Sequence, residues 1–178
     1  MILFVPHAAD DQSRTYSHEL ARRLPDIGVL QAPDPAADDD AAWPGSSRVR
    51  STWQSFQLSR HLQRLREPVH LPSEGLARYA MNLRVPYLVT VHGDGSDLGR
   101  RDVKALRRAA GLIAFDAGLR DSLVDDLGIA EERVYLVADA PGARETHRIY
   151  EALETAYYQG TVNRASDAGF RVALSAPR

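Results

Sequence analysis

The residues best suited to chemistry in this sequence follow a run of β-prone residues, Tyr87 to Val91. His92 comes directly after the run and is followed by Gly93, Asp94 and Gly95. An imidazole can act as a general base near neutral pH, glycines let the backbone approach a ligand, and carboxylates accept hydrogen bonds from hydroxyl groups. We interpret His92 and Asp94 as candidate catalytic residues and the two glycines as substrate-binding. The alternative for His92 is a structural histidine that is hydrogen-bonded to a neighbouring loop.

Two further histidines lie at or next to predicted strands. His7 follows an apolar run at residues 2–6, and Asp10 comes shortly after it, so we interpret both as substrate-binding residues. The alternative for His7 is a polar cap at the end of a strand. His70 lies in a brief apolar run and is a weaker candidate. The three histidines come from separate segments without the H-x-x-x-H spacing of a helical metal site, so no metal is expected.

Charged residues after the candidate turn extend the predicted site. Arg100 and its neighbour Arg101 lie in the predicted first turn of a helix, where backbone N–H and guanidinium groups can hold a phosphate. A solvated arginine pair is the alternative. Asp116 can cap the following helix and is also interpreted as substrate-binding. No G-x-G-x-x-G follows the first strand, and Walker and G-x-S-x-G motifs are missing, which argues against dinucleotide, P-loop and α/β-hydrolase sites.

Segments with strand and helix patterns alternate along the chain, and the connections between residues 70 and 138 are short. This alternation predicts an α/β fold: one Rossmann-like, doubly wound, mainly parallel sheet with right-handed crossovers and helices on both faces. Ligands bind such sheets beyond the carboxyl ends of the strands, which is where His7 and His92 are expected. The predicted strands are residues 2–6, 27–30, 69–71, 87–91, 112–115 and 134–137.

Composition narrows the functional class. The 178 residues suit a single domain, 1–178, and the formal net charge of −2 gives no reason to expect nucleic acid as a partner. The sequence has no cysteine, which excludes disulfides and thiolate chemistry. No signal segment or membrane-spanning run is recognised, so a cytoplasmic protein is expected. The single lysine among 22 basic residues is typical of a high-GC bacterial genome.

The less regular segments are expected to lie around this sheet. Residues 33–45, which carry prolines and aspartates without periodicity, are interpreted as a mobile surface loop. A short linker at 139–143 precedes a helix at 144–158, and residues 161–178 form a tail that is either a strand or a frayed end.

Residues 86–138 resemble a known family. A strand ending in His92-Gly93, a helix, the segment Ala109 to Asp116 with its strand Leu112 to Phe115, a second helix and the strand Val134 to Val137 are similar to the amino-terminal, acceptor-side domain of retaining GT-B glycosyltransferases. The resemblance implies a nucleotide sugar as co-substrate, no separate cofactor, and contact between His92 and the transferred sugar. The strand before Asp116 normally ends in a serine in that family.

The chain departs from the family in the parts that bind the donor. The Gly-Gly loop after the first strand is replaced by residues 7–11, and neither the Glu-x7-Glu element nor room for the donor-binding domain is present. The resemblance implies that 144–158 corresponds to the helix that crosses back onto the first domain, with the donor domain replaced by a linker. A structure with this helix detached from the sheet would refute that hypothesis.

Three functions remain open from the sequence. The first is a glycosyltransferase-like protein, minimal or dependent on a partner, acting on a polar sugar or sugar phosphate. A second protein or another copy of the chain would then supply the donor site. The second function is a non-catalytic accessory subunit. The third is a small α/β enzyme in which His7 or His92 is the base and Asp10, Asp94 or Asp116 orients it.

Overall fold

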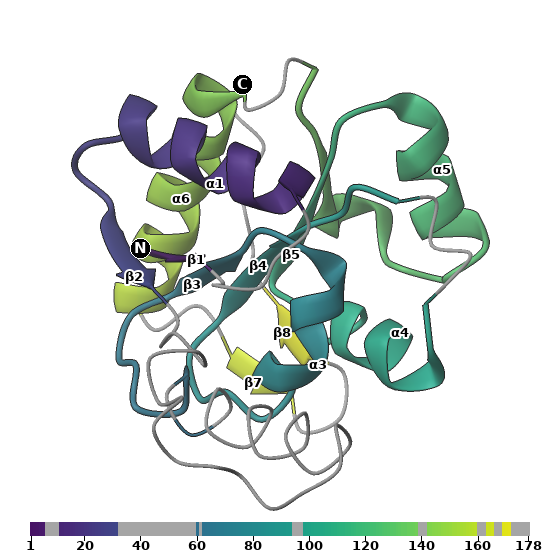
Figure 1. The fold of residues 1–178 in the computed structure, drawn as a ribbon. Coiled ribbons are helices and arrows are strands. Elements are labelled where there is room, and N and C mark those ends of the chain that lie inside the picture. Colours follow the sequence, from purple (N-terminus) through teal and green to yellow (C-terminus); the bar gives the residue numbers. More distant parts are fainter. Residues whose placement is uncertain are drawn as a thin grey trace, which may run out of the picture.

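The computed structural model describes residues 1–5, 11–31, 60, 62–93, 98–138, 142–159, 163–165 and 169–171. These residues form one six-stranded parallel sheet flanked by helices, which confirms the predicted α/β, Rossmann-like fold class (Figure 1). The predicted strands all form, with ends that differ by at most one residue. They are β1 Ile2–Val5, β2 Gly28–Gln31, β3 Val69–Leu71, β4 Tyr87–Thr90, β5 Gly111–Ala114 and β6 Val134–Leu136.

The order of the strands locates the edge at which ligands bind. The sheet runs β2-β1-β3-β4-β5-β6 with every neighbouring pair parallel. From β1 the chain moves outward to β2 and then returns to the other side of β1, so the order reverses between β1 and β3. In open α/β sheets ligands bind at the carboxyl ends of the strands near such a reversal. The turn after β3, which begins at Pro72, lies at this point.

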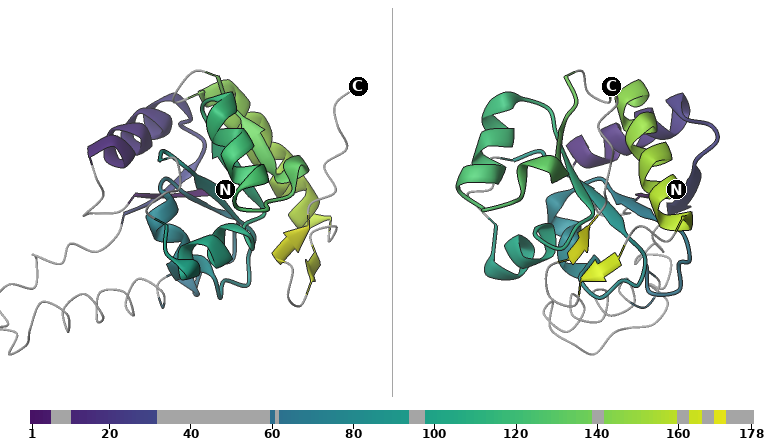
Figure 2. Two further views of the ribbon diagram at one scale, coloured as in Figure 1. Left: turned by 90° about the vertical axis from the view of Figure 1, so that its right-hand side faces the viewer. Right: turned by 180° about the vertical axis from the view of Figure 1, so that it is seen from behind.

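Helices cover both faces of the sheet, as a doubly wound fold requires. The helices α1 and α6 pack on one face and α3 and α4 on the other, while α5 packs against β5 and β6 (Figures 1 and 2). Two 3-10 turns, η1 Glu74–Leu76 and η2 Glu131–Arg133, precede α3 and β6. The α-helices are α1 Asp11–Arg23, α3 Ala77–Ala80, α4 Arg100–Leu106, α5 Ala117–Asp125 and α6 Ala143–Tyr158.

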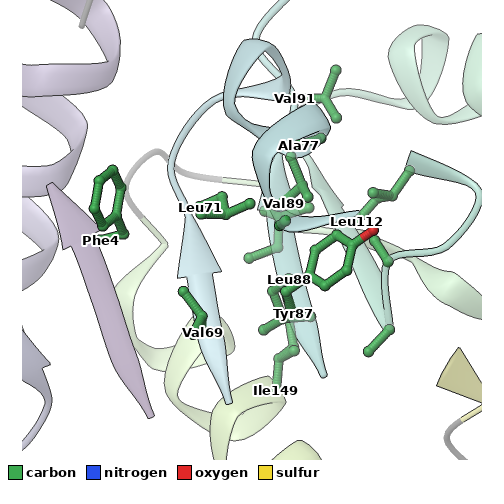
Figure 3. Packing of buried hydrophobic residues seen from close by; sticks show 14 of the residues in the cluster. Phe4, Val69, Leu71, Ala77, Tyr87, Leu88, Val89, Val91, Leu112 and Ile149 are labelled. Atoms are coloured by element: carbon green, nitrogen blue, oxygen red, sulfur yellow. The ribbon is translucent and has the colours of Figure 1, made fainter. Parts of the chain in front are cut away.

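Apolar side chains on both faces of the strands form the core. Figure 3 shows Phe4, Leu71, Val89 and Leu112, from four neighbouring strands, packed into one cluster. Each is fully buried, and burial of a side chain of this size stabilises the fold by roughly 1.5–3 kcal/mol. Gly111 is required by close packing, because a Cβ there would lie 2.5 Å from the ring of Tyr135.

The helix predicted at 144–158 is α6, and it packs on the sheet. Its buried side chains Ile149, Tyr150 and Leu153 face the strands, and the Tyr150 hydroxyl is hydrogen-bonded to His70 of β3. The helix follows Gly142, whose φ of 50° lies in the left-handed region that glycine adopts readily. Because the helix is attached to the sheet, the structure does not refute the hypothesis that residues 144–158 correspond to the crossing helix of the glycosyltransferases. That correspondence itself stays a hypothesis.

Several expectations need adjustment or fall outside the described residues. The spacing of Leu76, Tyr79, Ala80 and Leu83 in the sequence predicts a continuous helix from Ser73, whereas the structure forms η1 followed by the single α-turn of α3. Part of the tail forms a hairpin of β7 Asn163–Ala165 and β8 Gly169–Arg171, paired antiparallel. The loop 33–45 and most of the linker 139–143 are not among the described residues. None of the described helices is both long and apolar enough to cross a membrane.

Candidate functional site

His92 lies just beyond β4 and is held by the turn that follows β3. Its ring Nε2 is 2.8 Å from the carbonyl oxygen of Pro72, and its backbone N–H donates to a carboxylate oxygen of Glu74 at 3.2 Å. A carbonyl oxygen can only accept a hydrogen bond, so Nε2 carries the proton. In the neutral ring Nδ1 is therefore the acceptor. This atom is buried, and no donor among the described residues reaches it.

Two aromatic rings pack against the imidazole. The ring of Tyr16, from α1, meets His92 edge-on with centroids 5.4 Å apart, and Phe115 lies 5.6 Å away at a tilt of 35°. Tyr16 and Phe115 also contact one another, at 5.6 Å. His92 and Phe115 are both half-buried. The imidazole is thus fixed by ring contacts on its sides and by Pro72 at Nε2.

A chain of buried polar groups lies beneath His92. The hydroxyl of Tyr150 contacts Nδ1 of His70, whose Nε2 is 2.7 Å from Oγ1 of Thr90. Thr90 Oγ1 in turn donates to the hydroxyl of Tyr16 at 3.2 Å. The donor directions are consistent when His70 carries its proton on Nε2 and accepts from Tyr150 at Nδ1. These bonds connect α6, β3, β4 and α1.

Burial keeps every member of this chain uncharged. It lowers the pKa of His70 to about 3, with a smaller contribution from the nearby His92, and raises the pKa of Tyr16 to about 12. The pKa of Tyr150 is raised well above its usual value, mainly by burial and further by Tyr16. These hydrogen-bonded side chains therefore form a neutral support for the site near physiological pH.

The other predicted site residues divide into two groups. Gly93 directly follows His92, and Asp116 directly follows Phe115, which contacts the His92 ring. The Asp116 carboxylate caps α5 by accepting the backbone N–H of Leu119 at 2.8 Å. Arg100 is exposed at the start of α4. His7, Asp10, Asp94 and Gly95 lie outside the described residues, and a ligand-binding or catalytic role for all of these residues stays a prediction.

The beginning of α4 already contains a carboxylate. Asp102 is buried, and its Oδ2 accepts the backbone N–H of Gly99 at 3.2 Å. Its Oδ1 lies 2.8 Å from Nε of Arg78, an ion pair rather than an aligned hydrogen bond. The negative charge of Asp102 in the first turn interacts favourably with the positive end of the helix dipole. Phosphate binding by Arg100 would thus depend on its guanidinium group more than on the helix terminus.

Sequence reasoning missed two residues that surround His92. The spacing of Tyr16 with Leu20 and Leu24 predicts only that Tyr16 lies on the apolar face of a helix, and nothing in the sequence distinguishes Glu74. A signal for Tyr16 was present: His70 and Thr90 are polar residues inside buried strands, and such groups need hydrogen-bond partners on the helix that covers them. His70 itself lies within the core, away from the open edge of the sheet.

Two observations bear on what kind of site this is. Among the described residues, no group of three or more histidine, aspartate or glutamate side chains could hold a metal ion. No family model matches the chain, and no curated protein matches it. The site is therefore interpreted from its own geometry: an oriented imidazole with an unused acceptor, at the sheet edge where ligands bind in this fold.

Proposed function

We propose that this protein is glycosyltransferase-like and binds a sugar or sugar phosphate at the carboxyl edge of its sheet. The observation that supports this proposal is the state of His92: Nε2 is bonded to Pro72, and Nδ1 has no donor among the described residues. A buried acceptor without a partner costs about 1–3 kcal/mol, which a ligand hydroxyl would recover. The resemblance of residues 86–138 to acceptor-side domains makes a sugar the first ligand to test.

In this proposal His92 binds and orients one hydroxyl group of the sugar through Nδ1. The lack of a side chain at Gly93 lets the ligand approach the backbone, and Asp94 accepts a second hydroxyl. Transfer itself needs a nucleotide sugar, and in this proposal a second protein or a second copy of the chain supplies the donor site. The contribution of this chain to the rate is then orientation of the acceptor.

The direct test is ligand binding by thermal shift and calorimetry, with free hexoses, hexose phosphates and nucleotide sugars as probes. A ligand at one hundred times its dissociation constant stabilises the folded state by ~2.7 kcal/mol. His92→Ala is expected to remove the shift. His18→Ala is the matched control, because His18 is exposed on α1 and should leave the shift intact. Absence of a shift with every probe would reject the proposal.

Arg100 allows the phosphate to be tested separately from the sugar. Loss of one charge-assisted hydrogen bond of about 1.5–3 kcal/mol should weaken binding of a hexose phosphate by roughly 10-fold or more in Arg100→Ala. Binding of the free hexose should not change. Arg22→Ala is the control, since Arg22 is also exposed but lies in the last turn of α1. Equal losses for both ligands would argue against a phosphate contact.

A small α/β enzyme with a His/Asp acid–base site is the second candidate, and the tautomer of His92 favours it. The unprotonated Nδ1 is the atom that a general base requires. Turnover of a hexose phosphate by the isolated chain, abolished in His92→Ala, would support this candidate. Ligand binding without turnover, with or without a donor nucleotide sugar, would instead favour the accessory-subunit function.

A further inference from the structure

We propose that Tyr16 is the positioning residue for His92 and that the buried chain Tyr150-His70-Thr90 holds Tyr16 in place for this task. The proposal deepens the proposed function, because it names the group that presents Nδ1 of His92 to a ligand. It rests on the contacts of His92 and Tyr16 and holds for any ligand that binds at this site. Tyr16 itself does not touch the ligand.

The first step of the argument is the position of the Tyr16 ring. This ring packs edge-on against His92 at a centroid distance of 5.4 Å and against His70 at 6.0 Å. Tyr16 thus lies between His92, at the end of the sheet, and His70, in the core. Edge-to-face contacts have a preferred geometry, unlike aliphatic contacts. The ring of Tyr16 therefore restricts rotation of the imidazole about its side-chain bonds, whereas a leucine at this position would not.

The second step is the anchor at the other end of the ring. The Tyr16 hydroxyl accepts from Thr90, which is bonded to His70, which is bonded to Tyr150. All four side chains are almost completely buried, where the loss of one hydrogen-bond partner leaves another polar group unsatisfied. The position of Tyr16 is thus set by three other elements of the fold, β3, β4 and α6.

The third step concerns what this geometry does to His92. With the ring fixed, Nε2 stays on the carbonyl oxygen of Pro72 and the proton stays on Nε2. If the ring could turn about its Cβ–Cγ bond, Nε2 would leave the carbonyl oxygen of Pro72, the proton would no longer be fixed on Nε2, and Nδ1 would sometimes be a donor. Tyr16 thereby selects one tautomer and one orientation of His92. As a result, Nδ1 is always available to accept a hydrogen bond from a ligand hydroxyl.

The test uses the ring nitrogens of His92 as a spectroscopic signature. In protein labelled with 15N-histidine, long-range proton–nitrogen spectra should show a single His92 tautomer with its proton on Nε2. Tyr16→Phe keeps the ring but removes the hydroxyl that anchors it, so it should shift both ring nitrogens slightly. Tyr16→Leu removes the ring as well and should shift them toward the average of two tautomers. Tyr158→Leu, at a tyrosine that is 67% exposed, is the control and should leave the spectrum unchanged.

Ligand binding then separates this proposal from the proposed function. With glucose 6-phosphate or another hexose phosphate that binds the wild type, Tyr16→Leu should lower the affinity about 10-fold or more and Tyr16→Phe less than 3-fold. If no sugar probe binds, the proposed function fails, and the apo spectra still test the role of Tyr16. Should Tyr16→Leu fail to fold, Tyr16→Met, which fills a similar volume without a ring, takes its place. An unchanged His92 spectrum in the folded ring-free variant would overturn the proposal.

Discussion

The Nε2 atom of His92 lies 2.8 Å from the carbonyl oxygen of Pro72, and this hydrogen bond connects the segment just beyond β4 to the turn after β3. The bond has two separable effects. It stabilises the connection between neighbouring strand ends, and it determines which ring nitrogen is left as an acceptor. A variant that keeps one effect and removes the other can therefore test the role of His92 without unfolding the site.

His92→Gln is that variant, because a glutamine amide nitrogen can replace Nε2 as donor to Pro72 while nothing replaces Nδ1. We expect the free energy of unfolding to stay within about 0.5 kcal/mol of the wild type, and hexose phosphate affinity to fall roughly 10-fold. His92→Ala should lose both the affinity and about 1 kcal/mol of stability. Urea denaturation and calorimetry measure the two quantities. Wild-type affinity in His92→Gln would show that Nδ1 is not the ligand contact.

Asp116 can be tested for its two roles by a similar pair of substitutions. Asp116→Ala removes the acceptor of the Leu119 N–H and should lower the free energy of unfolding by about 1 kcal/mol. Asp116→Asn keeps a capping oxygen and should cost a few tenths of that. If the carboxylate also binds a ligand, Asp116→Asn weakens binding without a loss of stability in urea titrations. Equal binding in Asp116→Asn and wild type would leave helix capping as its only role.

Gly111 should not tolerate a side chain. A Cβ at this position would lie 2.5 Å from the Tyr135 ring and 2.8 Å from Leu88, so Gly111→Ala should lower the free energy of unfolding by about 1–3 kcal/mol. Gly75→Ala is the matched control, since its nearest neighbour is 3.8 Å away at Ser73. Adding Tyr135→Leu to Gly111→Ala should recover part of the loss, which a double-mutant cycle would detect as coupling between the two sites.

His70 predicts a specific dependence of stability on pH. Its pKa is about 3 in the folded protein against 6.5 when exposed, so the unfolded chain binds a proton first as the pH falls. Proton uptake by His70 in the unfolded chain therefore lowers the free energy of unfolding as the pH falls from 6.5 to 3. The decrease is at most ~1.4 kcal/mol per pH unit. His70→Gln should remove this part of the slope, and exposed His18→Gln should not. Urea titrations at pH 7, 6 and 5 would show it; parallel slopes for His70→Gln and wild type would contradict it.

Most of the sheet could be predicted because its signals are local. The strands of a parallel sheet are buried on both faces, so each one is visible as a short apolar run between capping residues. Tyr87 to Val91 is the clearest case, and β4 covers Tyr87–Thr90. The expected helix from Ser73 was only partly right, because the apolar period there does not distinguish a 3-10 turn followed by one α-turn from a continuous helix.

The candidate site was less predictable because its contacts are set by register and packing. His92 could be identified from its place after a strand, but its contact with Pro72 requires β3 and β4 to be neighbours, with His70 opposite Leu88. The role of Tyr16 depends on which way α1 turns above those strands. Its spacing with Leu20 and Leu24 indicates only that it faces the core, and a tyrosine there is equally consistent with simple packing.

The buried chain of hydrogen bonds also determines when the fold can be completed during synthesis. Tyr16 and Thr90 are separated by 74 positions, and His70 and Tyr150 by 80. Loop closure over such distances is slow, and parallel sheets fold slowly for the same reason. A nascent chain that has produced β1 to β6 but not α6 would leave His70 without its tyrosine partner. The core is therefore expected to reach its final packing only after α6 has been translated.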